Sequence, residues 1–192
     1  MGGVTGLGLG ALGAMAVLAA VALWAAVSYN RLVGDRSRAE EAWAGIDVQL
    51  QRRADLVPNL VETVEGYRVH EQDVLVDVTK ARADVAGARG PAAAGAADDA
   101  LEGQLQRLFA VAEAYPELGA SEQYLSLQRQ LIVLEEEISF ARRYFNALVQ
   151  RYNTRIQRVP TVLIAGPLGF LALEYFKAGA EDRAVPTTEL GR

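Results

Sequence analysis

The feature that most constrains this chain is an uncharged segment at its N-terminal end. From Met1 to Asn30 the sequence contains no Lys, Arg, Asp, Glu or His, and from Val4 to Val27 nearly every residue is apolar or small. About 20 apolar residues in a helix, at about 1.5 Å each, cross a hydrocarbon core of roughly 30 Å. We therefore predict that residues 1–28 form a transmembrane anchor and that the lipid bilayer is one partner of this protein.

A cleaved signal peptide is the alternative interpretation of the same segment. Ala20-Val21-Ala22 is a small-residue sequence of the kind found at cleavage sites. Signal peptides, however, normally begin with a positively charged region and have a shorter apolar stretch. No Lys or Arg precedes this one, and Trp24 and Tyr29 near its end suit a membrane interface. The pattern favours a retained anchor.

The charges that flank the anchor predict its orientation. Arg31, Arg36 and Arg38 follow the apolar segment directly, whereas its N-terminal side carries no charged side chain. Positively charged flanks stay in the cytoplasm during membrane insertion. We therefore predict a single-pass protein of the cell membrane with its N-terminus outside and the rest of the chain in the cytoplasm.

Small residues recur at every fourth position of the anchor, at Gly2, Gly6, Gly10 and Ala14. This spacing places them on one helix face, where two helices can approach closely in lipid. The pattern predicts that the span associates with itself into a homo-oligomer. The alternative is that Gly and Ala are simply common here, since Gly8 and Gly13 lie off the stripe.

The composition excludes several functional classes. The 192 residues include no Cys and a single His, His70, so disulfide frameworks, thiol catalysis and two-His metal sites are ruled out. The net charge of -5 lacks the basic excess typical of nucleic-acid binding, and no nucleic-acid partner is expected. Glu135, Glu136 and Glu137 are consecutive on a helix, where about 100° separates neighbours, and are expected to be solvated. We predict no catalytic residues, no cofactor and no metal ligands.

Beyond the anchor, heptad spacing predicts long amphipathic helices. The clearest series has 3-4-3-4 spacing and comprises Tyr124, Leu127, Leu131, Leu134, Ile138, Ala141, Phe145, Leu148 and Tyr152. Ser121 is the expected N-cap of this helix and Pro160 ends it. At about 36 residues, the helix would be about 54 Å long.

Two earlier series share that spacing, one from Tyr29 to Leu50 and one from Val57 to Val85, with Glu71 as the polar exception. Asp55 could cap the second helix, with Pro58 in its first turn. The hairpin is the expected arrangement, but because the apolar seam stays in phase across Leu50, Arg53 and Val57, a single kinked helix remains an alternative to it.

The rest of the chain completes an all-α prediction. Residues 87–99 are rich in Gly and Ala and are expected to connect two helices, and a shorter helix is expected over residues 98–114. We predict an antiparallel up-down four-helix bundle of long helices over residues 29–158. Residues 177–192 are expected to form a disordered tail.

Residues 159–176 are apolar but interrupted by Pro and Gly, which makes a second span improbable by composition. The segment either packs on the bundle or lies at the membrane surface. An up-down bundle would return its last helix, and this segment, to the bilayer. A single helix through Pro58 would instead carry both to the distal end.

Several blocks of the sequence resemble the LemA family. They are Tyr29-Asn30-Arg31-Leu32-Val33, EAWAGIDVQLQRRADLVPNLVETVEGYRVHE from Glu41 to Glu71, AVAEAYPEL from Ala110 to Leu118, ARRYFNALVQRYNTRIQRVP from Ala141 to Pro160, and the later LGF and EYF. The resemblance implies a four-helix bundle on an N-terminal membrane anchor. The resemblance does not by itself point to any enzymatic activity.

These observations favour a membrane-anchored scaffold or adaptor that binds an unidentified protein partner. Arg52, Arg53, Asp55 and Asn59 are the candidate partner-binding residues, although the sequence favours helix capping as the explanation of the first three. One alternative function is a regulatory or substrate-handling subunit of a membrane-embedded enzyme such as a protease, held through the span. An enzyme that uses Glu or Arg in the bundle core is the third.

Overall fold

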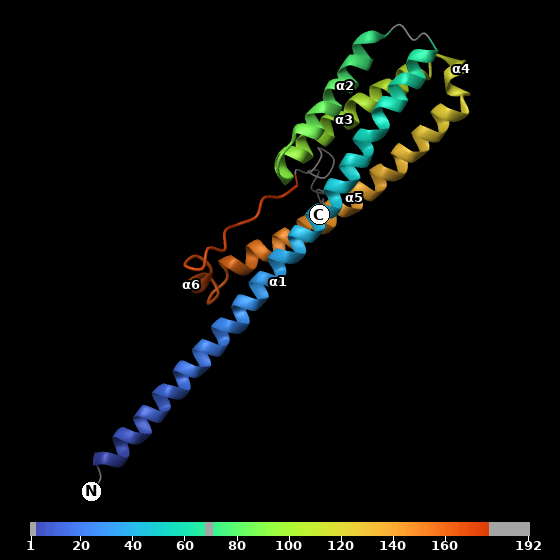
Figure 1. Ribbon diagram of the computed structural model, residues 1–192. Helices are drawn as coiled ribbons and strands as arrows, with labels where there is room; N and C mark the ends of the chain where they lie inside the picture. The colour runs from blue at the N-terminus through green and yellow to red at the C-terminus, as the bar shows by residue number, and fades with distance from the viewer. Residues whose placement is uncertain (1–2, 68–70, 177–192) are drawn as a thin grey trace, which may run out of the picture. The chain divides into compact units, whose positions relative to one another are not determined.

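The computed structural model describes residues 3–67 and 71–176 (Figure 1). Within these ranges six helices follow one another: α1 (Gly3–Gly66), α2 (Gln72–Gly87), α3 (Pro91–Ala112), α4 (Pro116–Gly119), α5 (Glu122–Gln157) and α6 (Val162–Ala165). The described residues contain no strand, so the all-α prediction is confirmed. Gly2, His70 and the predicted tail at 177–192 lie outside the described residues.

The first helix is one continuous element of 64 residues. It runs through Arg52 and Asp55 without a turn, so the hairpin interpretation is wrong and Asp55 is not an N-cap. The chain turns later, where α1 ends at Gly66 and α2 begins after Glu71. The predicted helix from Val57 to Val85 is therefore two helices, interrupted beside the polar exception in its heptad pattern.

Pro58 lies inside α1, where proline removes one backbone hydrogen bond. The acceptor left over is the carbonyl oxygen of Ala54, four residues earlier. Arg82 on α2 donates its Nε–H to this oxygen at 2.8 Å. The neighbouring helix thus supplies the bond that Pro58 cannot make, and α1 continues.

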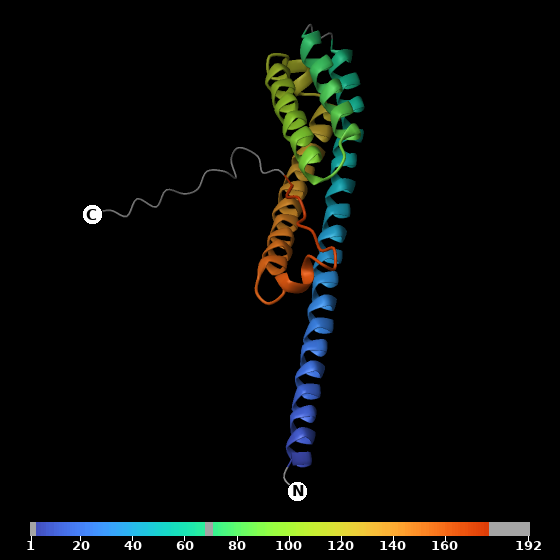
Figure 2. The same cartoon turned by 90° about the vertical axis from the view of Figure 1, so that its left-hand side faces the viewer.

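By their contacts the residues divide into two compact units, each of which contains part of α1 and part of α5. Of the described residues, the larger unit comprises 40–67, 71–147 and 174–176. Here α2 and α3 lie side by side, with segments of α1 and α5 alongside them (Figure 2). Apolar residues of the three heptad series form the core of this unit, and apart from the half-buried Trp43 they are buried: Ile46, Leu60, Val64, Leu131, Leu134, Ile138 and Phe145.

The boundaries of α3 and α5 follow from local sequence. α3 begins at Pro91, directly after Gly90 with its positive φ of 81°, so most of the predicted connection at 87–99 is helical. Proline at the first helical position and the alanines that follow favour this early start. α5 begins as predicted, because the Oγ of Ser121 accepts the Tyr124 N–H at 3.4 Å.

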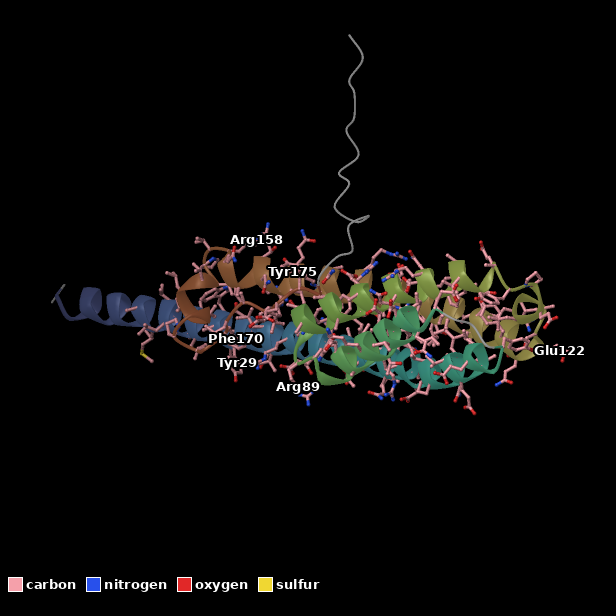
Figure 3. All side chains as sticks on the ribbon, turned by 90° about the horizontal axis from the view of Figure 1, so that it is seen from above. Tyr29, Arg89, Glu122, Arg158, Phe170 and Tyr175 are labelled. Atoms are coloured by element: carbon pink, nitrogen blue, oxygen red, sulfur yellow. The ribbon has the colours of Figure 1, made fainter. Side chains whose placement is uncertain are left out.

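Of the described residues, the smaller unit comprises 3–39 and 148–173. Its apolar cluster consists of Leu32, Tyr152, Ile156, Ala165 and Phe170, with Leu173 packed against it. The rings of Tyr29 and Phe170 meet edge to face, with centroids 5.5 Å apart (Figure 3). The end of α5 thus lies beside the part of α1 that directly follows the apolar segment.

This placement corrects one consequence drawn from the sequence. A single helix through Pro58 was expected to carry residues 159–176 away from the anchor. Instead, the last part of α5, from residue 148, and the chain that follows it to residue 173 belong to the same compact unit as the described residues 3–39 of α1. The segment after α5 therefore packs its Phe170 against Leu32 and Tyr152.

Among the described residues, one helix is long and apolar enough to cross a membrane, by length and composition, and it is α1. Its apolar window has a mean hydropathy of 2.0, and none of that window is buried by other parts of the protein. Large side chains there are exposed, namely Leu12, Met15, Val17, Leu18, Val21 and Leu23. Such a surface is suited to lipid contact.

Candidate protein-interaction groove

The four residues predicted to bind a partner all lie on α1, but they divide between two environments. Arg52, Asp55 and Asn59 are exposed, whereas Arg53 is 2% exposed. Asp55 accepts a hydrogen bond from the side-chain amide of Gln51 at 3.1 Å. Asn59 contributes its backbone carbonyl, which accepts the Thr63 hydroxyl at 2.7 Å. Arg52, Asp55 and Asn59 are therefore available to a partner at the surface, whereas Arg53 belongs to the interior of the protein.

Arg53 is the centre of a buried charge cluster that joins three helices. Its Nη1 donates to Asp98 Oδ1 on α3 at 2.6 Å, and its Nη2 is ion-paired with Glu135 on α5. The Asp98 side chain is buried with it, which leaves the guanidinium compensated in an environment where an unpaired charge is costly. The cluster fixes the positions of α1, α3 and α5 around the core.

Glu136 and Glu137 are exposed as expected, whereas Glu135 keeps 35% of its side-chain surface exposed and is also ion-paired with Arg53, a contact that the sequence did not predict. Sequence reasoning missed the cluster because Asp98 falls in the stretch interpreted as a connection. The signal available was that Arg53 interrupts an otherwise apolar seam between Leu50 and Val57. A charged residue on a buried face requires a partner of opposite charge.

On the outer side of α1 and α5 lies a groove with a volume of about 560 Å³. Its walls are apolar, with Leu56 on α1 and Val133 and Leu134 on α5. Charged side chains surround it on both helices, and they are Arg52, Asp55, Arg129 and Glu137. Two of the four residues singled out from the sequence, Arg52 and Asp55, thus line this groove, and Arg53 and Asn59 do not.

The apolar surface continues from the groove along α5. Val133 is 53% exposed, Phe140 68% and Tyr144 54%. Their spacing of seven and then four residues places them on one face of the helix. This stripe was readable in the sequence as a second 3-4 series beside the core seam, interrupted by Glu137. Exposed aromatic side chains are enriched where proteins bind one another.

The groove has the composition of a binding surface. The described part of the chain contains no group of three or more His, Cys, Asp or Glu side chains close enough to hold a metal ion. The charges at the groove are carried by two Arg and two acidic side chains, so its rim is balanced in charge. An apolar floor with such a rim suits another helix with an apolar face.

Comparison with known proteins agrees with the resemblance in the sequence. A sequence model of the LemA family matches residues 42–190. Protein LemA of Metamycoplasma hominis is 26% identical, over 84% of this chain and 74% of its own length. Magnetosome protein MamQ of Magnetospirillum gryphiswaldense is 27% identical, over 84% of this chain and 70% of its own. Magnetosome protein MamQ 2 of Paramagnetospirillum magneticum is 26% identical, over 94% and 77%.

Proposed function

This chain belongs to the LemA family, and from that membership, the apolar N-terminal helix and the groove we propose that it is a membrane-anchored scaffold without catalytic activity. Residues 1–28 cross the cell membrane once, and the helices of residues 29–158 act as a four-helix bundle in the cytoplasm. The bundle binds a protein partner in the groove between α1 and α5.

The single observation that carries this proposal is the set of exposed apolar side chains on the groove side of α5. Val133, Phe140 and Tyr144 each expose more than half of their surface. Large apolar side chains gathered on one exposed helix face, here with only Glu137 between the first two, are typical of a surface that a partner covers. Its position on a helix of 36 residues favours a partner that contributes a helix of its own.

The charged residues at the rim of the groove would select the orientation in which a partner helix binds. Arg52 and Asp55 stand on one wall, and Arg129 and Glu137 stand on the other. A partner helix with apolar residues every third or fourth position and charges of both signs beside them would match this rim. Rim pairs contribute little affinity but select orientation, so the apolar contacts hold the complex together.

Site-specific photocrosslinking in native membranes tests the proposal. A photoreactive amino acid at Val133 or Phe140 of the full chain should crosslink to a discrete protein band, and Val133→Glu should abolish the band formed from Phe140. Val76 on α2 is the matched control, because it is an apolar residue 63% exposed and lies outside the groove. Equal crosslinking from Val76 and Phe140 would contradict a defined groove site.

A second candidate function is a regulatory or substrate-handling subunit of a membrane-embedded enzyme. The uncovered apolar side chains from Leu12 to Leu23 favour it, since they are available to another membrane helix. The stripe of Gly2, Gly6, Gly10 and Ala14 would serve the same contact or a homo-oligomer. Replacing residues 1–28 with an unrelated span should spare a groove-bound partner and release one that is held through the span.

The membrane location and orientation have a separate test. The full chain should stay in the membrane pellet during an alkaline carbonate wash, and release into the supernatant would exclude an anchor. Because the chain has no Cys, a single Arg89→Cys variant places one thiol in the exposed loop between α2 and α3. A membrane-impermeant maleimide should label it only after the cells are permeabilised.

A further inference from the structure

We propose that a cationic pocket next to the apolar segment of α1 binds the phosphate of an anionic lipid headgroup. The inference rests on the proposed membrane anchor. The pocket belongs entirely to the smaller unit and has a volume of about 570 Å³. Its charged lining consists of Arg31, Asp35 and Arg38 from α1 and Arg151 and Arg155 from α5.

Asp35 organises the pocket. Its side chain is only 4% exposed, and it holds three guanidinium groups. Arg38 Nη1 lies 3.2 Å and Arg151 Nε 3.7 Å from Asp35 Oδ1, and Arg155 is ion-paired with Oδ2. Because one carboxylate anchors Arg groups from both helices, these groups are positioned before any ligand binds, which reduces the entropy cost of binding.

The charges of the pocket do not balance. Four Arg side chains and one Asp line it, which leaves an excess of three positive charges. Among the residues that the structure describes, Arg31 has no acidic side chain within ion-pair distance. Arg38 and Arg151 keep 58% and 57% of their side-chain surface exposed. A phosphate group matches this excess of positive charge, since one guanidinium can donate two parallel N–H hydrogen bonds to two phosphate oxygens.

The position of the pocket along α1 selects a lipid as the source of the phosphate. The lining begins at Val27, the last residue of the apolar segment. At about 1.5 Å per residue, Arg31 lies about 6 Å beyond Val27. The headgroup layer on each side of a bilayer is roughly 5 to 8 Å thick. Arg31 is therefore at the depth where lipid phosphates lie.

The chain after α5 gives independent support for this depth. In the same unit, Leu163 is 71% and Leu171 75% exposed, while the neighbouring Ala165 and Phe170 are buried against α1 and α5. Leucines this exposed are suited to the boundary between headgroups and acyl chains. A pocket for soluble phosphate would need no such surroundings. The apolar exposure and the cationic excess are both explained if this unit sits at the lipid interface.

Native mass spectrometry of the full chain released from nanodiscs tests the proposal. The nanodiscs contain phosphatidylglycerol and phosphatidylcholine, and the readout is the ratio of the two lipids retained by the protein. The wild type should prefer phosphatidylglycerol. Because each basic residue near a membrane surface contributes about 1 kcal/mol, Arg31→Gln should lower the preference about fivefold and Arg31→Gln with Arg38→Gln about thirty-fold.

The matched control is Arg89→Gln with Arg143→Gln, which removes the same charge from exposed positions of the other unit and should keep the wild-type preference. Arg31→Gln breaks no ion pair of the described residues, so misfolding does not explain its effect. Carbonate resistance of every variant verifies that the anchor is intact, which separates loss of the pocket from loss of insertion. An absent preference in the inserted wild type, an equal loss in the control, or displacement by inorganic phosphate would each overturn the proposal.

Discussion

Arg82 donates a hydrogen bond to the carbonyl oxygen of Ala54, the acceptor that Pro58 leaves without a partner in the middle of α1. Ala54 is 1% exposed, so water cannot easily replace this donor. A buried carbonyl without a hydrogen bond costs about 1 to 3 kcal/mol. The contact therefore explains how a proline is accepted where the sequence also suggested a turn.

Arg82→Met should lower the free energy of unfolding by about 1 to 3 kcal/mol, because the Ala54 carbonyl loses its donor. Pro58→Ala restores a backbone N–H to that carbonyl, so Arg82→Met should cost less in the Pro58→Ala background. The measurement is a double-mutant cycle by urea unfolding of the full chain in detergent micelles. Additive effects of the two changes would show that the carbonyl does not couple them.

Arg53→Met should destabilise the protein by about 3 to 5 kcal/mol, because Asp98 and Glu135 would stay buried or half-buried without their cation. The exposed neighbour Arg52→Met is the control and should change stability by less than about 1 kcal/mol. Adding Asp98→Leu to Arg53→Met should recover part of the loss, since an apolar pair replaces an unpaired charge. Equal effects at Arg52 and Arg53 would refute the buried cluster.

Leu60→Ala and Leu134→Ala should both destabilise the protein within about 2 to 5 kcal/mol, with the larger loss at Leu60. Leu60 is fully buried, whereas Leu134 is 8% exposed and borders the groove, where the surroundings can relax into the space left. Chemical unfolding monitored by circular dichroism gives both values. An unchanged midpoint for Leu134→Ala would place that residue outside the core.

Asn153→Ala should release the segment that follows α6 from α5. The side-chain amide of Asn153 donates to the Leu173 carbonyl and its oxygen accepts the Leu173 N–H, both at 2.9 Å. We expect chymotrypsin to cleave the variant after Phe170 or Leu171 much faster than the wild type, because the two hydrogen bonds that hold Leu173 to α5 are lost. Thr154→Ala changes an exposed neighbour and should not alter the cleavage rate.

Two residues of the candidate groove could be singled out from the sequence, but the groove that they line could not. Arg52 and Asp55 were recognisable as charges flanking a helical seam, and both line the groove. Val133, Phe140 and Tyr144 belong to the same helix as the predicted core seam, and heptad spacing alone does not say which of two apolar faces is covered. Arg53 was grouped with Arg52 because the two are adjacent in the sequence. Adjacent residues on a helix point about 100° apart, so Arg53 is buried while Arg52 is exposed.

The sequence by itself determined the helical class, the extent of α5 and the apolar character of α1, because these depend on periodicity and composition within one segment. Only the tertiary structure decided whether α1 turns at Arg53 or continues to Gly66. Proline stops a helix unless something else satisfies the freed carbonyl, and here the donor is Arg82, on a different helix. The buried charge cluster and the cationic pocket depend on tertiary structure in the same way. Asp98 and Glu135 contact Arg53, and Arg155 contacts Asp35, only after segments distant in the sequence have packed together.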